Sequence, residues 1–233
     1  MVRLLLFVSI FPVFLVGSYI YNKDRDREPM NLIWKLFFGG VISTVITLIL
    51  SSLIGYVFPI FNAEPNSLDA FSLFIFVFIG VALVEEVSKW IVLYVLSYNH
   101  EECDQLYDMI VYAVFVALGF ACFENILYVF SGGIGVGITR AFTAIPGHAC
   151  DGVFMGYYLG LAKINEVNGN YRLKRRNMFL SLFVPMMLHG IYDYLLFLNN
   201  WVFGLIFLVF FIVYFIITVK KVRKLSGLNS RFK

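Results

Sequence analysis

Long apolar runs alternate with short polar connections along the whole chain. About 20 consecutive apolar residues suffice for a helix to cross the hydrocarbon core of a bilayer, and by this measure the sequence predicts about seven membrane-spanning helices. The predicted spans are residues 2–21, 33–58, 70–97, 107–130, 138–162, 178–197 and 201–220. Pro146 and several glycines interrupt the fifth span. We therefore predict an all-α, polytopic membrane helix bundle.

The composition supports a membrane protein. Hydrophobic residues make up 61% of the chain and charged residues only 14%, whereas about 25% of the residues of soluble domains are charged. No internal repeat and no long soluble insertion divides the sequence, so residues 1–233 are predicted to form one domain in contact with the lipid bilayer. The net charge of +3 is small and gives no reason to expect a nucleic-acid partner.

Lys and Arg residues gather in alternate connections and so predict the orientation. They occur near residues 23–27, near residues 163–176 and in the basic tail at 221–233, whereas the connections near Asn62, Gly132 and Asn199 contain none. Because loops rich in Lys and Arg stay in the cytoplasm, the amino terminus is predicted to lie outside. The carboxy terminus and its tail are then predicted to lie inside.

Ionisable residues also occur inside the apolar runs, where each costs roughly 2.5 to 3.5 kcal/mol if it stays charged and unpaired. They are Glu85, Glu86, Lys89, Glu124, His148, Asp151, His189 and Asp193. Counted at about 1.5 Å per residue from the outer helix ends, most of them converge on the outer half of the membrane. Four separate helices thus bring acids and imidazoles to similar depths, which indicates a polar working site inside the bundle.

The spacing within each helix restricts which side chains can meet. Glu85 and Lys89 are four residues apart and share a helix face, whereas Glu86 points about 100° away. His189 and Asp193 are also four apart, so both side chains reach the same region, as two ligands on one helix do in metal sites. Taken alone, the first pair is more typical of a structural ion pair, and the second is compatible with a buried hydrogen bond. The complete set favours a functional site.

Glycines follow His148 at four-residue intervals. They are Gly152, Gly156 and Gly160. Such a ladder of small residues lets a neighbouring membrane helix approach closely, so we interpret it as a packing surface.

These residues occur in an ordered series of motifs. Glu85-Glu86-Val87-Ser88-Lys89 is an EExxK motif, Phe120 to Glu124 forms FxxxE, and His148 and His189 stand in separate later motifs, the second with Asp193. The series resembles the PrsW-type intramembrane proteases, which are related to the CAAX prenyl endopeptidase and Abi superfamily. The likeness extends over nearly the whole chain, through Glu28-Pro29, Tyr107-Asp108, Phe123 to Tyr128, Arg140-Ala141 and His189 to Asp193. Asp151 departs from the more apolar residue expected there.

The resemblance implies a function in the bacterial plasma membrane. It implies that the substrate is a single-pass membrane anti-sigma factor, which is cut first on its extracytoplasmic side. That cut leads to release of a sigma factor under envelope or antimicrobial-peptide stress.

Peptide hydrolysis needs an activated water, a stabilised oxyanion and a proton for the leaving amine. The catalytic residues are expected to be Glu85 as general base and later acid, Glu86 as its partner or as a metal ligand, and His148. Glu124, His148, His189 and Asp193 are expected to bind a divalent metal, with zinc favoured by two imidazoles and carboxylate. In a metal-free alternative, Glu85 and His148 orient the water while His189 and Asp193 assist the oxyanion.

Other functional classes remain open. A CAAX-type prenyl endopeptidase-like or Abi-like membrane protein shares the general fold, and an ion-coupled transporter also places carboxylates at membrane depth. Transporters more typically contain repeated halves with broken helices in matching positions, which this sequence lacks. A non-catalytic membrane scaffold would tolerate loss of the ionisable residues.

Overall fold

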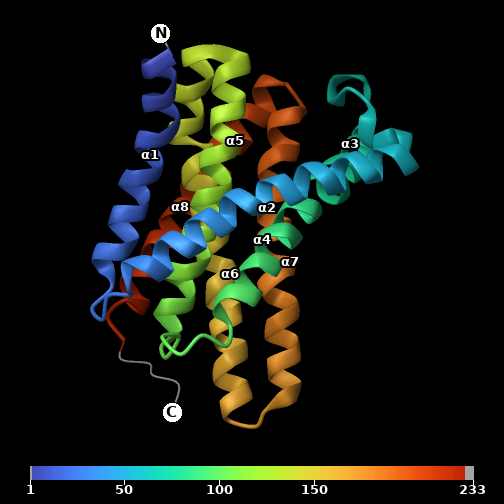
Figure 1. Ribbon diagram of the computed structural model, residues 1–233. Coiled ribbons are helices and arrows are strands. Elements are labelled where there is room, and N and C mark those ends of the chain that lie inside the picture. The colour runs from blue at the N-terminus through green and yellow to red at the C-terminus, as the bar shows by residue number, and fades with distance from the viewer. Residues whose placement is uncertain (1, 229–233) are drawn as a thin grey trace.

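The computed structural model describes residues 2–228, which form helices joined by short connections (Figure 1). The longer helices are α1 (Val2–Lys23), α2 (Met30–Val57), α4 (Val84–Ser97), α5 (Leu106–Phe142), α6 (Ala144–Val167), α7 (Tyr171–Phe197) and α8 (Trp201–Leu225). Between α2 and α4 lie the shorter η1 (Pro59–Asn62), η2 (Pro65–Ser67), α3 (Ala70–Ile75) and η3 (Phe76–Leu83). The predicted all-α fold is confirmed.

Within residues 2–228, six helical segments are long and apolar enough to cross a membrane. One of them, Leu106–Val167, has 62 residues and at full helical extension would measure about 93 Å, three times the thickness of a bilayer core. Its backbone leaves helical geometry at Gly133, with φ of 81°, and again at Thr143. In Figure 1, α5 runs to the upper end of the bundle and the chain returns from there into α6. This segment therefore crosses twice, in agreement with the predicted count of about seven spans.

The fifth predicted span begins earlier and breaks at a different place than expected. Residues 134–142 already belong to the returning part of α5, and the break falls at Thr143 rather than at Pro146. Pro146 is the third residue of α6, where a backbone N–H has no partner within the helix. The proline therefore removes no helical hydrogen bond.

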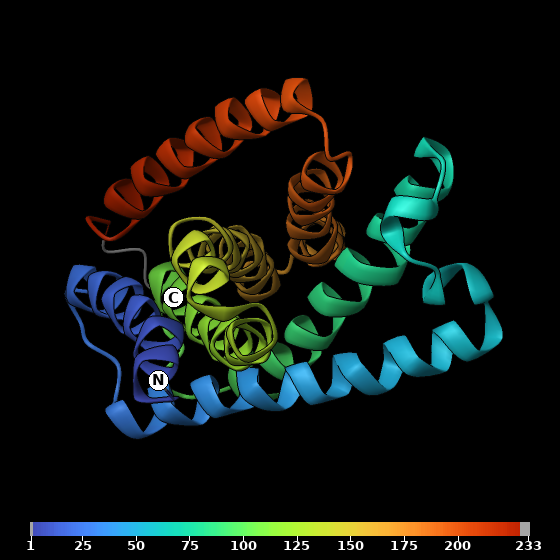
Figure 2. The same ribbon diagram turned by 90° about the horizontal axis from the view of Figure 1, so that it is seen from above.

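Helix α5 occupies the centre of the bundle and carries much of its buried core. Nearly every residue from Leu106 to Cys122 is buried, and α1, α2 and α6 all pack against this helix. Figure 2 shows α5 in the middle, with α1 and α2 on one side and α7 and α8 on the other. A helix that is apolar all round is expected in such a central place.

Glycines allow the closest helix contacts. A Cβ added to Gly40 of α2 would collide with the Val116 carbonyl of α5, and one added to Gly119 of α5 would collide with the Phe37 carbonyl of α2. The predicted ladder on α6 is confirmed as a packing surface, because Gly156 lies against the backbone of Met109 on α5. These contacts fix α5 between α2 and α6.

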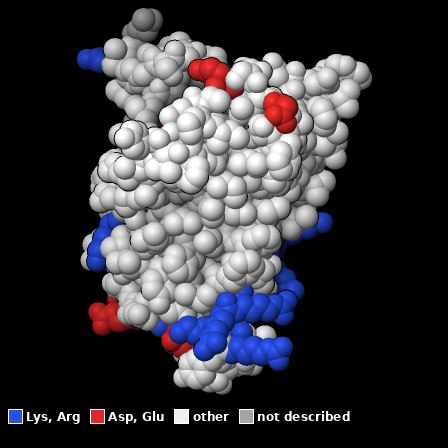
Figure 3. Space-filling view, turned by 90° about the vertical axis from the view of Figure 1, so that its right-hand side faces the viewer, with Lys and Arg blue, Asp and Glu red and all other residues white. Residues whose placement is uncertain are grey.

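The connections rich in Lys and Arg lie at one end of the bundle. Figure 3 shows the blue side chains gathered towards the lower end, where α1 joins α2 and α6 joins α7. Arg3, at the start of α1, lies at the opposite end. Inside and outside remain predictions from this asymmetry. Residues 229–233 of the predicted basic tail lie outside the described part of the chain.

Candidate active site

The first acids of the site follow directly after a π-helix. The helix η3, with its wider i→i+5 hydrogen bonding, ends at Leu83, and α4 then carries Glu85, Glu86 and Lys89 into the bundle. Short π-helical stretches occur frequently at functional sites, because the extra residue in a turn changes the face on which later side chains lie. In this protein Glu85, Glu86 and Lys89 all lie on the side of α4 that faces the bundle, and each of the three is buried.

Lys89 is a buried cation that links both glutamates. Its Nζ lies 2.7 Å from Glu86 Oε1 and 3.5 Å from Glu85 Oε2, and it stands over the Phe120 ring at 4.1 Å from the centroid. The Nζ also lies 3.3 Å from His148 Nδ1. Glu86 is completely buried, whereas the side chain of Glu85 keeps 11% of its surface exposed. Glu85 is thus the member of the pair that faces the cavity.

Glu124 of α5 and His148 of α6 contact each other across the interface between these two helices. Glu124 Oε2 lies 3.0 Å from His148 Nε2 and accepts a hydrogen bond of 2.6 Å from Arg140 Nη2. Arg140 also donates from Nε to Asn125 Oδ1 at 3.0 Å. Because Arg140 lies on the returning part of α5, the reversal at Gly133 brings this guanidinium back to the site.

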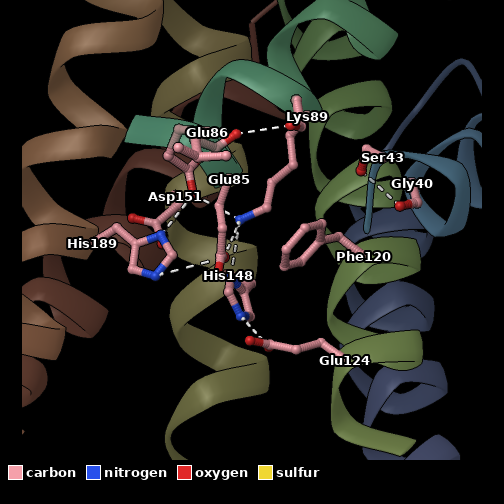
Figure 4. A network of polar contacts seen from close by, with 12 residues as sticks. Gly40, Ser43, Glu85, Glu86, Lys89, Phe120, Glu124, His148, Asp151 and His189 are labelled. Atoms are coloured by element: carbon pink, nitrogen blue, oxygen red, sulfur yellow. Dashed lines mark hydrogen bonds and ion pairs between the residues drawn. The ribbon is translucent and has the colours of Figure 1, made fainter. Parts of the chain in front are cut away.

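His189 of α7 contacts the two glutamates of α4 and an aspartate on its own helix. Its Nδ1 lies 2.8 Å from Glu86 Oε1. Its Nε2 lies 3.3 Å from Asp193 Oδ2 and 3.8 Å from Glu85 Oε2. Figure 4 shows His189, His148 and Glu85 pointing toward one another from three different helices. The imidazole is therefore held on one side by a fully buried carboxylate and presents its other nitrogen to the cavity.

Asp151 also enters the constellation. It follows His148 by three residues on α6 and is buried. Its Oδ1 accepts a hydrogen bond of 2.6 Å from the hydroxyl of Tyr214 on α8. This partner supplies the polar contact that a carboxyl group needs in an apolar helix bundle.

Two overlapping groups of side chains offer ligand atoms within 4.8 Å of one another. One consists of Glu86, His148, Asp151 and His189, and the other of Glu85, Glu124 and His148. His148 belongs to both groups. Of the four ligands expected from the sequence, Glu124, His148 and His189 fall into these groups, whereas Asp193 falls into neither and contacts His189 instead.

Two cavities meet at the site and share Val81, Glu85, Glu124 and Tyr128. One has a volume of about 350 Å³ and contains both histidines and Asp193 on its wall. It reaches Pro65 and Phe197, which lie at the end of the bundle opposite the basic connections. The other, of about 370 Å³, extends toward Thr44, Thr47 and Ser51 on α2. The acids and imidazoles therefore line a space large enough for part of a peptide.

Sequence reasoning missed three partners of this site. Arg140 could have been recognised, because an arginine within an apolar segment normally pairs with an acidic residue. Its partner Glu124, however, lies 16 residues away across a chain reversal. Asn125 directly follows Glu124, and nothing in the sequence marks its amide as a partner of Arg140. Tyr214 is one of many aromatic residues on α8, so nothing in its surroundings marks it as the donor to Asp151.

The chain is similar in sequence to a family of known proteins. A sequence profile described as PrsW family intramembrane metalloprotease matches residues 28–219. The chain is 38% identical to Protease PrsW of Oceanobacillus iheyensis over 82% of each chain. It is 35% identical to Protease PrsW of Bacillus subtilis over 94% of this chain and 95% of that protein, and 33% identical to Protease PrsW of Clostridioides difficile over 82% and 79%. No solved structure matches the chain.

Proposed function

Because the chain belongs to the PrsW family of intramembrane metalloproteases, we propose that this multi-pass bacterial membrane protein cuts a single-pass anti-sigma factor on its extracytoplasmic side. The observation that carries the proposal is the cavity of about 350 Å³ on which Glu85, Glu124, both histidines and Asp193 converge. This cavity opens away from the basic connections, which are the predicted cytoplasmic end.

Glu85 is the proposed general base. Its side chain lines the cavity and keeps 11% of its surface exposed, so the carboxylate is able to accept a proton from a water placed there. After attack on the scissile carbonyl, the same carboxyl group would pass that proton to the leaving amine. Lys89 at 3.5 Å stabilises the ionised form that is needed to start the cycle.

Glu86 has a different proposed role from Glu85. It holds His189 Nδ1 at 2.8 Å while its own charge is matched by Lys89. A carboxylate in this position fixes the tautomer and the orientation of an imidazole that works through its other nitrogen. Glu86 is therefore proposed as a positioning residue rather than as the base.

The donors suit a metal ion. Two imidazoles and several carboxylates are ligands that zinc accepts, and His148 belongs to both groups whose ligand atoms lie within 4.8 Å of one another. The proposed ligands are Glu124 and His148, 3.0 Å apart, with His189 and its neighbour Asp193 on the same cavity wall. A bound divalent ion would supply a Lewis acid for the carbonyl and an acidified water.

The Glu85→Gln variant tests the role of general base separately from metal binding. We expect purified Glu85→Gln protein to retain the metal content of the wild type but to lose peptide cleavage by a factor of at least about 100, the usual contribution of a general base. His148→Ala and His189→Ala should lose both metal and activity. Metal content is measured by mass spectrometry after dialysis. Full wild-type activity after verified metal removal would instead establish the metal-free mechanism.

The substrate proposal is tested in cells. Wild-type protein and the Glu85→Gln variant are co-expressed with tagged single-pass anti-sigma factors, and the fragments are compared at equal protein levels. We expect a shortened fragment only with the wild type, produced by a cut on the external side. If no anti-sigma factor is cut while a general peptide substrate is, the substrate assignment is wrong and the protease assignment stands.

A further inference from the structure

A second group of buried acids lies far from the active site, where the chain passes from α1 to α2 and where α5 begins. Asp24, Glu28 and Asp108 each offer a carboxylate oxygen within 4.8 Å of the others. All three are buried, with exposed fractions of 8%, 6% and 1%. Asp108 precedes Glu124 by 16 positions on α5, or about 24 Å along the helix axis. The two groups are therefore separate sites.

Hydrogen bonds from the protein satisfy only part of this group. Asp108 Oδ2 accepts the backbone N–H groups of Asp104 and Gln105 at 3.0 and 2.6 Å. Glu28 Oε2 accepts the hydroxyl of Tyr112. Asp24 Oδ1 accepts the N–H of Asp26 at 3.2 Å. The other oxygens of Asp24 and Asp108 are fully buried and have no hydrogen-bond partner.

No Lys, Arg or His within residues 2–228 forms an ion pair with any of the three carboxylates. Burial raises the pKa of Asp24 to about 6 and that of Glu28 to about 8. Buried carboxylates are normally paired with a cation or bind a metal, because the charge is costly to remove from water. Residues 2–228 therefore supply no cationic side chain that is ion-paired with this group.

We propose that Asp24, Glu28 and Asp108 bind a hard divalent cation of the Ca²⁺ or Mg²⁺ type. The donor set consists of carboxylate oxygens without imidazole or thiolate, which is the chemistry that these ions prefer. Asp24 Oδ2 and Asp108 Oδ1 are buried without hydrogen-bond partners, so each can still coordinate an ion. The ion would join the α1–α2 connection to the first turn of α5.

An acidic cavity adjoins this site at Glu28 and is the entrance that we propose for the ion. It has a volume of about 80 Å³ and is lined by Glu101, Glu102 and Asp104, together with Arg27. Such carboxylates raise the local concentration of cations at the entrance. The basic connections at the same end of the bundle put this entrance on the predicted cytoplasmic side.

The test is a calorimetric titration of the full-length protein in detergent micelles with CaCl₂ or MgCl₂, at about pH 8 so that protons compete less for the ligands. We expect the wild type to bind one equivalent. Asp24→Asn and Asp108→Asn should each weaken binding at least about tenfold, the scale of lost metal affinity when a site is damaged. The asparagine at 108 keeps a carbonyl oxygen for the N–H groups that Asp108 accepts.

Two controls separate this site from others. Glu102→Gln makes the same charge change at an exposed position beside the entrance and should change the affinity less than about twofold, as expected of a screened surface charge. His148→Ala damages the active site and should leave the equivalent of Ca²⁺ or Mg²⁺ bound.

Three results would overturn the cation site. These are no saturable binding of either ion up to about 10 mM, beyond the range of known oxygen sites, unchanged binding in both asparagine variants, or loss of the bound equivalent in His148→Ala. If Asp108→Asn does not fold, the wild type and Asp24→Asn decide the question. Peptide cleavage is not the measured quantity, so the outcome does not depend on the proposed protease function.

Discussion

At the scale of single residues, the site depends on how a few buried charges are paired. Lys89 is 1% exposed and makes its shortest contact, 2.7 Å, with the fully buried Glu86. Breaking such a pair by removing one partner leaves an uncompensated charge in a medium of low polarity. The pair is therefore expected to matter for stability as well as for the orientation of His189.

We predict that Glu86→Gln lowers the free energy of unfolding by roughly 3 to 5 kcal/mol, because Lys89 then keeps its charge without its nearest partner. The double variant Glu86→Gln/Lys89→Met should regain part of this loss. Unfolding is followed by circular dichroism during denaturant titration in mixed micelles. The comparison variant is Glu166→Gln, which breaks the partly exposed ion pair with Lys174 and should cost less than about 1 kcal/mol. Equal losses in both single variants would contradict the explanation.

At the scale of secondary-structure elements, close helix packing sets where the catalytic side chains lie. Gly119 precedes Phe120 and lies against the backbone of α2, at Phe37 and Gly40. Any side chain at this position pushes α5 away from α2 and moves Glu124, little more than one turn further on. The small residue thus connects helix packing to the geometry of the site.

Gly119→Ala is predicted to destabilise the bundle by roughly 1 to 3 kcal/mol, the usual cost of overpacking, and to reduce cleavage. Thermal unfolding in micelles and peptide cleavage at a temperature where the variant stays folded measure the two effects. Gly204→Ala on α8 is the matched control, because a Cβ there meets nothing within 4 Å. It should be neutral or slightly stabilising, since alanine favours helix over glycine. A similar loss in both variants would point to a cause other than the α2–α5 contact.

At the scale of the whole molecule, the charged connections and the cavity lie at opposite ends of the bundle. Lys and Arg occupy the end where α1 joins α2 and α6 joins α7, and the cavity with the histidines reaches Pro65 and Phe197 at the other end. From the positive-inside rule we predict that the entrance of the active site lies outside the cytoplasm.

Single cysteines test this orientation after Cys103, Cys122 and Cys150 are replaced by alanine. In intact cells, a membrane-impermeant maleimide is expected to label Asn66→Cys, in the connection between α2 and α3. It should label Glu101→Cys and Arg172→Cys only after the cells are permeabilised. The reverse labelling pattern would show that the protein has the opposite orientation in the membrane, with the proposed cut on the cytoplasmic side.

The sequence by itself determined the membrane class and the approximate spans, and it predicted the depth of the ionisable residues. These properties are local, because about 20 apolar residues make a span and a separation of four residues puts two side chains on one helix face. His189 and Asp193 indeed contact each other at 3.3 Å. The glycine ladder on α6 was likewise readable as a packing surface, since small residues at this interval serve close approach.

Only the tertiary structure decided which helices meet and which side chains pair across them. The link from Glu86 to His189 joins residues 103 positions apart, and the reversal at Gly133 returns Arg140 to Glu124. The approach of the α1–α2 connection to the start of α5, where Asp24 and Asp108 come together, is of the same kind. Spacing along one helix carries no information about such neighbours, because they depend on the packing and direction of separate helices.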